Sequence, residues 1–187
     1  KNPVSFSDFG INPQLNDVKK GVELFRSGNY NQIIAIGGGS VLDMAKLISV
    51  FAHQSEYLKA IVEGNAPIIG KKTPLLAITT TAGSGAEATS FAVVYIGSLK
   101  YSVAHEIMLP DMIYIDASFS FTAGKYLTAC TGLDALCQAF ESVWSVAANE
   151  QSQKFAIQAI RLILENLEKS VQKSDVQAKQ NMQLAAY

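Results

Sequence analysis

An acid and two further polar residues recur at helical spacing in the stretch TGLDALCQAFES, residues 131–142. Asp134, Gln138 and Glu141 stand at positions i, i+4 and i+7, so a helix would project all three from one face. A carboxylate followed one turn later by a second polar side chain can form half of a metal or substrate site. Glutamine is a weak metal ligand because its amide carbonyl is neutral. The spacing therefore leaves three uses open for this face: binding a metal, binding another ligand, or packing.

Two glycine-rich segments offer a second kind of chemistry. GGGS (residues 37–40) and GSG (residues 83–85) each follow a short apolar run. Glycines let backbone N–H groups approach a ligand closely, and a helix N-terminus carries partial positive charge, so such turns favour a phosphate. The first segment departs from the G-x-G-x-x-G dinucleotide fingerprint, because Leu42 stands where a third glycine or alanine belongs. A tight turn without a ligand is the alternative for GGGS.

Alternating apolar runs and amphipathic stretches predict the elements that position these residues. Residues 15–28 read as a helix with a one-sided apolar stripe that Gly28 ends, and a second helix follows GGGS. The connections between the predicted strands are too long for hairpins, so we predict a parallel, doubly wound α/β sheet with both glycine turns at its carboxyl edge. The predicted strands are residues 4–9, 33–36, 74–80 and 111–116, of which residues 33–36 are expected to be fully buried.

The pattern beyond residue 120 is helical. Residues 122–145 read as one helix that carries Asp134 and Gln138, and a second starts at Asn149, a good N-cap. A third begins with Ser174 or Asp175 as its N-cap. We therefore predict an α/β nucleotide-binding domain at residues 1–120 and the start of an all-helical domain at residues 121–187.

Composition excludes several classes of partner. The chain of 187 residues has a formal net charge of −1 and is 49% hydrophobic, and no run of about 18 apolar residues occurs. We therefore expect no nucleic-acid partner and no membrane partner. Cys130 and Cys137 are the only cysteines, which indicates reduced thiols in a cytoplasmic protein. We expect Cys137 to be a buried, neutral thiol because no basic residue lies near it in the sequence.

Four segments in order and spacing carry a family resemblance. AIGGGSVLDMAK, TPLLAITTTAGSGAEAT, LPDMIYID and TGLDALCQAFES resemble the metal-dependent group III alcohol dehydrogenases, often called iron-containing alcohol dehydrogenases. The resemblance implies an NAD(P)-dependent oxidoreductase, NAD or NADP being open. It also implies a Rossmann-like domain followed by an all-helical domain, with the active site in the cleft between them, and a homo-oligomer. It covers roughly the middle half of a family member, so we expect the family's first strand and helix to lie outside these residues and the chain alone to be inactive.

The resemblance also implies cofactor contacts. Asp43 could instead cap its helix or pair with Lys46. The second loop departs from the family pattern, since Thr79 replaces a proline, Ser84 a threonine and Ala86 a serine, and Ala86 loses any contact made by a hydroxyl. The implied contacts to phosphates and ribose are Asn12, Gly38, Gly39, Ser40 and Asp43, and those to the rest of the cofactor are Thr80, Thr81, Ser84, Thr89 and Lys100.

The metal ligands are where the chain departs most from the resemblance. The family holds Fe²⁺ or Zn²⁺ with an Asp, a His four residues later and two further His downstream. Asp134 matches the Asp, while Gln138 stands in place of the first His. The resemblance thus implies a metal at Asp134 and Gln138 with a weak or vacant position, or a site that has lost its metal. His53 and His105 match no ligand position and are expected to be ordinary surface or helix-end residues. No catalytic acid or base is assigned.

The leading hypothesis is metal-assisted hydride transfer between NAD(P)H and a small aldehyde or ketone. Gln138 within ALCQAFESVWS also resembles the phosphonoacetaldehyde reductase branch, which makes phosphonoacetaldehyde one candidate substrate. One alternative is a sugar-phosphate enzyme of the dehydroquinate synthase-like branch. The other is a metal-free nucleotide-binding or oligomer-forming remnant without turnover.

Overall fold

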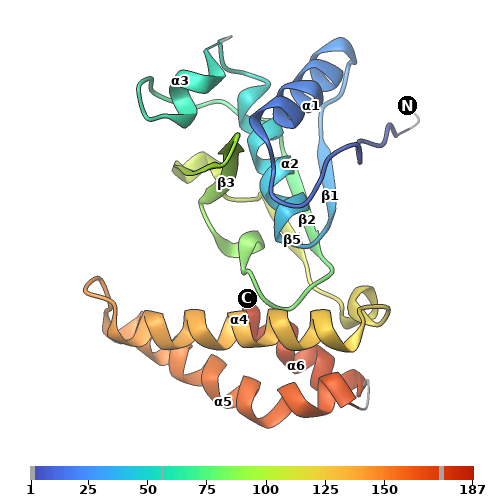
Figure 1. Cartoon of the computed structure of the whole chain (residues 1–187), viewed down its shortest axis with the longest axis vertical. Coiled ribbons are helices and arrows are strands. Elements are labelled where there is room, and N and C mark those ends of the chain that lie inside the picture. Colours follow the sequence, from blue (N-terminus) through green and yellow to red (C-terminus); the bar gives the residue numbers. More distant parts are fainter. Residues whose placement is uncertain (1–2, 56, 173–174) are drawn as a thin grey trace. The chain divides into compact units, whose positions relative to one another are not determined.

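A computed structural model describes residues 3–55, 57–172 and 175–187. The chain divides into two compact units that interleave along the sequence (Figure 1). The glycines of both turns belong to unit 2, together with the helical C-terminal part. Unit 1 comprises the residues up to Ile36, Ser40–Ala77 and Ala86–Ile113, and unit 2 comprises Gly37–Gly39, Ile78–Gly85 and Tyr114–Tyr187.

A three-stranded sheet has the strand order β1-β2-β5. Its first two strands are parallel, because they pair start to start and end to end. Ile33 N–H donates to Pro74 O where both begin, and Thr80 N–H donates to Gly37 O at 3.0 Å where both end. The predicted parallel α/β sheet is confirmed. The strands are β1 (Ile33–Gly37), β2 (Leu75–Thr79) and β5 (Met112–Tyr114).

Two strand predictions need correction. Residues 4–9 form no strand, because within the described residues no neighbouring strand pairs with them; Phe6 and Phe9 pack instead against the core of unit 1. The strand β1 is not buried on both faces: Ala35 is 3% exposed, whereas Ile34 and Ile36 are 57% and 54% exposed. Only the face that packs against α2 is covered, so burial alternates along the strand.

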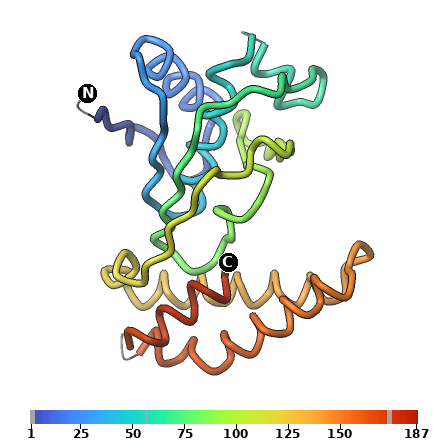
Figure 2. Tube along the Cα trace, turned by 180° about the vertical axis from the view of Figure 1, so that it is seen from behind, coloured from blue at the N-terminus to red at the C-terminus, as the bar shows by residue number. Residues whose placement is uncertain are grey.

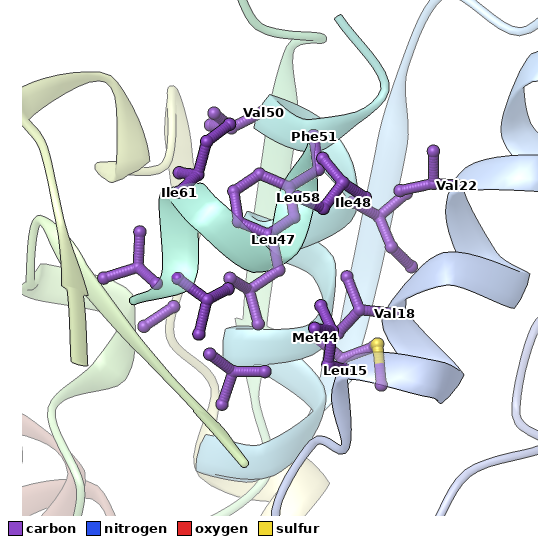
Figure 3. Packing of buried hydrophobic residues seen from close by; sticks show 14 of the residues in the cluster. Leu15, Val18, Val22, Met44, Leu47, Ile48, Val50, Phe51, Leu58 and Ile61 are labelled. Carbon is purple, nitrogen blue, oxygen red and sulfur yellow. The ribbon is translucent and has the colours of Figure 1, made fainter. Parts of the chain in front are cut away.

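Helices and a hairpin complete unit 1. The helix predicted at residues 15–28 is confirmed, and Gly28 caps it by donating to Phe25 O. The antiparallel β3–β4 hairpin was not predicted. In Figure 3, Val18 and Val22 of α1 lie near Met44 and Ile48 of α2, and Phe51 and the apolar side chains of α3 belong to the same core cluster. The elements are α1 (Leu15–Ser27), α2 (Gly39–Phe51, whose first residue belongs to unit 2), α3 (Leu58–Val62), η1 (Ala86–Ala88), β3 (Phe91–Ile96), β4 (Leu99–Ala104) and η2 (Glu106–Met108).

Three helices make the larger part of unit 2, and they lie side by side in Figure 2. Asn149 and Asp175 cap the second and third, as predicted, because their side chains accept from Ser152 N at 3.0 Å and Ala178 N at 2.8 Å. Ser174, the other predicted cap, lies outside the described residues. The helices are α4 (Lys125–Trp144), α5 (Glu150–Gln172) and α6 (Val176–Ala186), and η3 (Ala117–Ser120) comes before them.

None of the helices in the described parts of the chain has the length and apolar character that a membrane span requires.

Candidate cofactor and metal site

The two glycine turns contact each other in unit 2. A Cβ atom added at Gly38 would lie 3.1 Å from Thr81 Oγ1, and one added at Gly39 would lie 2.8 Å from Ser84 Oγ. Contacts this short are crowded, so glycine at both positions permits the close approach of the second turn. The close approach of the second turn thus explains the two glycines of the first turn, and it places Thr81 and Ser84 beside the start of α2.

The second glycine turn is fixed against α4 and α6. A Cβ atom at Gly83 would lie 2.7 Å from Thr131 Cβ and 2.8 Å from Thr131 O. Gly85 has a φ of +58°, in the left-handed region, and its added Cβ would lie 3.0 Å from Ala186 O. The helices of unit 2 therefore position this turn directly.

Thr80 and Thr81 follow β2 in the same turn. Thr79 Oγ1 donates to Thr81 O at 2.8 Å, which tightens the backbone at the end of the strand. Within the described residues, the hydroxyls of Thr80 and Thr81 have no hydrogen-bond partner. Both hydroxyls therefore remain able to bind a ligand.

Asn12 and Ser40 lie together in unit 1. The backbone N–H of Asn12 donates to Ser40 Oγ at 3.1 Å. Asn12 has a φ of +62°, a left-handed conformation that asparagine tolerates better than most residues. The Ser40 hydroxyl thus holds the chain before α1 in place, and the Asn12 side chain is exposed.

Asp43 ties α2 to the hairpin. Its Oδ2 accepts from Val93 N at 3.0 Å, so it neither caps a helix nor forms an ion pair with Lys46 within the described residues. Burial raises the pKa of Asp43, and the Val93 N–H and the charges of Lys46 and Lys100 oppose that rise. Lys100 itself is exposed on β4.

Lys46 is a fully buried cation that the sequence had suggested only as a possible partner of Asp43. It is 0% exposed, and its Nζ donates to Thr89 O at 2.8 Å, Thr89 Oγ1 at 2.9 Å and Phe91 O at 2.9 Å. Burial lowers the pKa of Lys46 to about 8, against the opposing charges of Asp43 and Glu87. Burial also raises the pKa of Glu87. Because the Thr89 hydroxyl also donates to a backbone carbonyl at 3.3 Å, it is committed to the fold. The sequence does indicate the burial of Lys46, because this lysine stands inside the apolar run VLDMAKLISV.

One exposed face of α4 carries the acid–amide pair. Asp134, Gln138 and Glu141 are all exposed, and Gln138 Nε2 donates to Asp134 Oδ2 at 2.9 Å. A carboxylate can only accept, which fixes the nitrogen of the amide as the atom that faces Asp134. The helical prediction for this stretch is confirmed. The hydrogen bond that Asp134 accepts comes from Gln138 of the same helix.

Two oxygen atoms of this pair have no partner in the described part of the chain, and their chemistry indicates which metal the pair could bind. Asp134 Oδ1 and Gln138 Oε1 take part in no hydrogen bond or ion pair within the described residues. Two oxygens of this kind fit a divalent cation, and they favour a harder ion than a site with imidazole would. The described residues contain no group of three or more His, Cys, Asp or Glu that could hold a metal.

Both histidines have structural partners in unit 1, as expected. His53 Nε2 lies 2.8 Å from Thr73 Oγ1. His105 Nδ1 accepts from Ile107 N at 3.2 Å and caps η2.

Cys130 and Cys137 are both exposed and free, so the prediction of a buried Cys137 is wrong. The buried face of α4 is made by Gly132, Ala135 and Ala139. Cys137 stands three residues after Asp134, and the helical period places it on the exposed side with that acid.

Comparison with known families agrees with this arrangement. The family described as iron-containing alcohol dehydrogenase matches residues 1–117, and the C-terminal family described as Fe-containing alcohol dehydrogenase matches residues 128–187. The chain therefore belongs to the iron-containing alcohol dehydrogenase family.

Similar proteins come from several bacteria. Long-chain-alcohol dehydrogenase 1 of Geobacillus thermodenitrificans is 36% identical over 97% of this chain, and aldehyde-alcohol dehydrogenase of Streptococcus pneumoniae is 34% identical over 97%. The chain spans 47% and 22% of their lengths, respectively. The solved structure of sulfoacetaldehyde reductase from Bifidobacterium kashiwanohense, in complex with NAD⁺, superposes with a TM-score of 0.93 at 26% identity. It matches 97% of this chain and 49% of its own. Alcohol dehydrogenase from Oenococcus oeni gives 0.91 at 30% identity, over 98% of this chain and 48% of its own.

Proposed function

We propose that the protein containing this chain is an NAD(H)-dependent oxidoreductase that interconverts a small aldehyde and its alcohol. The observation that carries the proposal is the pair of contacting turns in a chain of this family, with the hydroxyls of Thr80 and Thr81 unpaired in the described residues. The resemblance to a structure that contains NAD⁺ supports the choice of cofactor.

The cofactor's phosphates belong at the first turn in this proposal. Gly38 and Gly39 stand at the N-terminus of α2, a helix of 13 residues, where backbone N–H groups and the helix dipole favour an anion. Thr80 and Thr81 donate from the neighbouring turn. Ser84 completes this set in the second turn.

The candidate residues of unit 1 divide into two kinds. Ser40, Asp43 and Thr89 act indirectly, because their polar atoms already hold backbone and side-chain groups of the fold. Asn12 and Lys100 have exposed side chains. An amide and a cation of this kind can contact the cofactor directly.

A divalent metal forms the finer part of the proposal, held by Asp134 Oδ1 and Gln138 Oε1. When bound, such an ion supplies Lewis-acid polarisation of a carbonyl oxygen. The contribution of the chain itself is orientation: the N–H of Gln138 fixes the Asp134 carboxylate at 2.9 Å and prevents it from rotating freely.

An anionic two-carbon aldehyde is the substrate class that we favour. The sequence resembles the phosphonoacetaldehyde reductase branch, and one structural neighbour is a sulfoacetaldehyde reductase. Gln138 Nε2 carries two hydrogens, of which one points to Asp134. The second can donate to an anionic oxygen without loss of the first contact.

The test is oxidation of NADH and of NADPH by the full-length protein with phosphonoacetaldehyde, sulfoacetaldehyde and the neutral aldehyde propanal. We expect aldehyde-dependent oxidation of NADH, with a higher kcat/KM for the two anionic aldehydes. Absence of oxidation with every aldehyde would contradict the proposal. Equal kcat/KM for propanal and the anionic aldehydes would agree with the proposed dehydrogenase activity but contradict the proposed preference for an anionic substrate.

A nucleotide-binding protein without turnover is the second candidate, and the Gln138–Asp134 hydrogen bond is the observation that favours it. An acid already bound to its neighbour has less need of a metal. Binding of NAD⁺ in the absence of aldehyde-dependent oxidation would select this candidate.

A further inference from the structure

Lys179 on α6 is a buried cation with spare hydrogen-bond donors. The residue is 3% exposed, and its Nζ donates to Ser120 O at 3.0 Å. An ammonium group has three N–H donors, but within the described residues no second acceptor and no carboxylate bonds to this one. A buried donor without an acceptor is destabilising, because it has lost its hydrogen bond to water. The two remaining donors therefore require a partner.

A small cavity in unit 2 lies beside this ammonium group. Its volume is about 20 Å³, and a cavity needs about 10–15 Å³ to hold a water molecule. The space therefore suits one water and is too small for a phosphate. Its hydroxyl lining comes from the second turn, from η3 and from two helices: Thr80, Thr81, Ser120, Thr128, Thr131 and Ser170.

The hydroxyl hydrogens decide between a water and a small anion. Four of these hydroxyls, on Ser120, Thr128, Thr131 and Ser170, donate to backbone carbonyls at 2.8 to 3.1 Å. These four can therefore offer only lone pairs to the cavity, and lone pairs repel an anion. The hydroxyls of Thr80 and Thr81 can donate to either kind of occupant. The four committed hydroxyls thus favour an occupant that accepts from the ammonium group and also donates, as water does.

We propose that this cavity binds one ordered water molecule, which accepts a hydrogen bond from Lys179 Nζ and donates to the hydroxyl oxygens of α4 and α5. This site shares Thr80 and Thr81 with the proposed cofactor site, but its water takes no part in the proposed hydride transfer. Thr80 and Thr81 line the same cavity as Lys179. The water therefore connects the second turn to Lys179 of α6, and within the described residues no ion pair connects the two.

The test is a high-resolution crystal structure of the full-length protein, collected with and without a bromide soak. We expect density for one water within about 3.2 Å of Lys179 Nζ and of a hydroxyl oxygen, with no anomalous bromide signal. A bromide peak there would overturn the proposal in favour of an anion site. An empty cavity would overturn it as well.

A paired variant tests the lining. Thr131→Val with Ser170→Ala removes two acceptors while Lys179 stays in place, so we expect the water to be lost and the thermal midpoint to fall by about 4 °C. The matched control is Ser27→Ala, because the Ser27 hydroxyl also donates to a carbonyl three residues back, at 2.9 Å, but on the exposed end of α1. Retention of the water and of the midpoint in the paired variant would contradict the bridging role.

Discussion

The two buried lysines show how differently the two units use polar groups. Lys46 in unit 1 donates to three oxygens and lies among the opposing charges of Asp43 and Glu87. Lys179 in unit 2 donates to one carbonyl and faces a cavity. In unit 1 all three N–H donors of the buried cation have acceptors in the fold, whereas in unit 2 two donors of Lys179 have none within the described residues. Burial of a charge is therefore a weaker sign of function than unused donors are.

Most candidate cofactor residues follow a similar division. Ser40, Asp43 and Thr89 in unit 1 hold other parts of the fold, while Asn12 and Lys100 of the same unit have exposed side chains. Thr80 and Thr81 in unit 2 have hydroxyls with no partner in the described residues. This contrast makes distinct predictions for substitutions in the two units.

The largest effect is expected for Lys46→Met. The substitution removes a cation that donates three hydrogen bonds, and each acceptor left without its partner costs about 1–3 kcal/mol. Urea unfolding followed by circular dichroism should show this loss, with the exposed Lys19→Met as the matched control. A loss no larger than that of the control would remove the contrast between the two lysines.

Gly83→Ala should cost less, about 1–3 kcal/mol. The added methyl group would meet the backbone and Cβ of Thr131 at 2.7 to 2.8 Å, so the second turn must move away from α4. Gly70→Ala is the control, since a Cβ there meets nothing within 4 Å. Comparison of the two thermal midpoints measures the difference, and equal midpoints would show that the turn adapts freely.

Gln138→His should raise the affinity for Zn²⁺ about tenfold or more, because imidazole binds this ion better than a neutral amide does. Isothermal titration of the full-length protein with Zn²⁺ is the measurement, and Glu141→His on the same helix face is the control. Tighter binding by the wild type than by Gln138→His would mean that the amide is already the better ligand.

The smallest effect is a pH dependence from Lys46. Its pKa is about 8 in the folded chain, below its ordinary value of 10.5. Between these two values the unfolded chain binds more protons, so the stability contributed by Lys46 rises with pH. Urea midpoints from pH 8 to pH 10 should show a widening gap between wild type and Lys46→Met. A difference between the two urea midpoints that narrows with rising pH would contradict a lowered pKa of Lys46.

The sequence predicted the elements whose causes are local. Periodicity and capping residues located α1, α4 and the caps Asn149 and Asp175. Two features failed for a common reason: the strand expected at residues 4–9 and the burial of Cys137 both depend on which neighbour covers a segment. A pattern along the chain does not contain that information.

The site shows the same division. Spacing alone placed Asp134 and Gln138 on one helix face, but only the structure shows which amide atom meets the carboxylate. The roles of Asp43 and Lys46 depend on Val93 and Thr89, which lie more than 40 residues further along the chain.

Titration of NAD⁺ into the full-length protein tests whether the unpaired threonine hydroxyls bind the cofactor. Thr80→Val and Thr81→Val remove unpaired hydroxyls, so we expect each to weaken NAD⁺ binding about tenfold, the effect of one lost hydrogen bond of about 1.4 kcal/mol, with little change in stability. Thr89→Val should lower stability and leave the NAD⁺ affinity of the folded protein nearly unchanged. The reverse pattern, with affinity lost in Thr89→Val and kept in the Thr80 and Thr81 variants, would contradict the account.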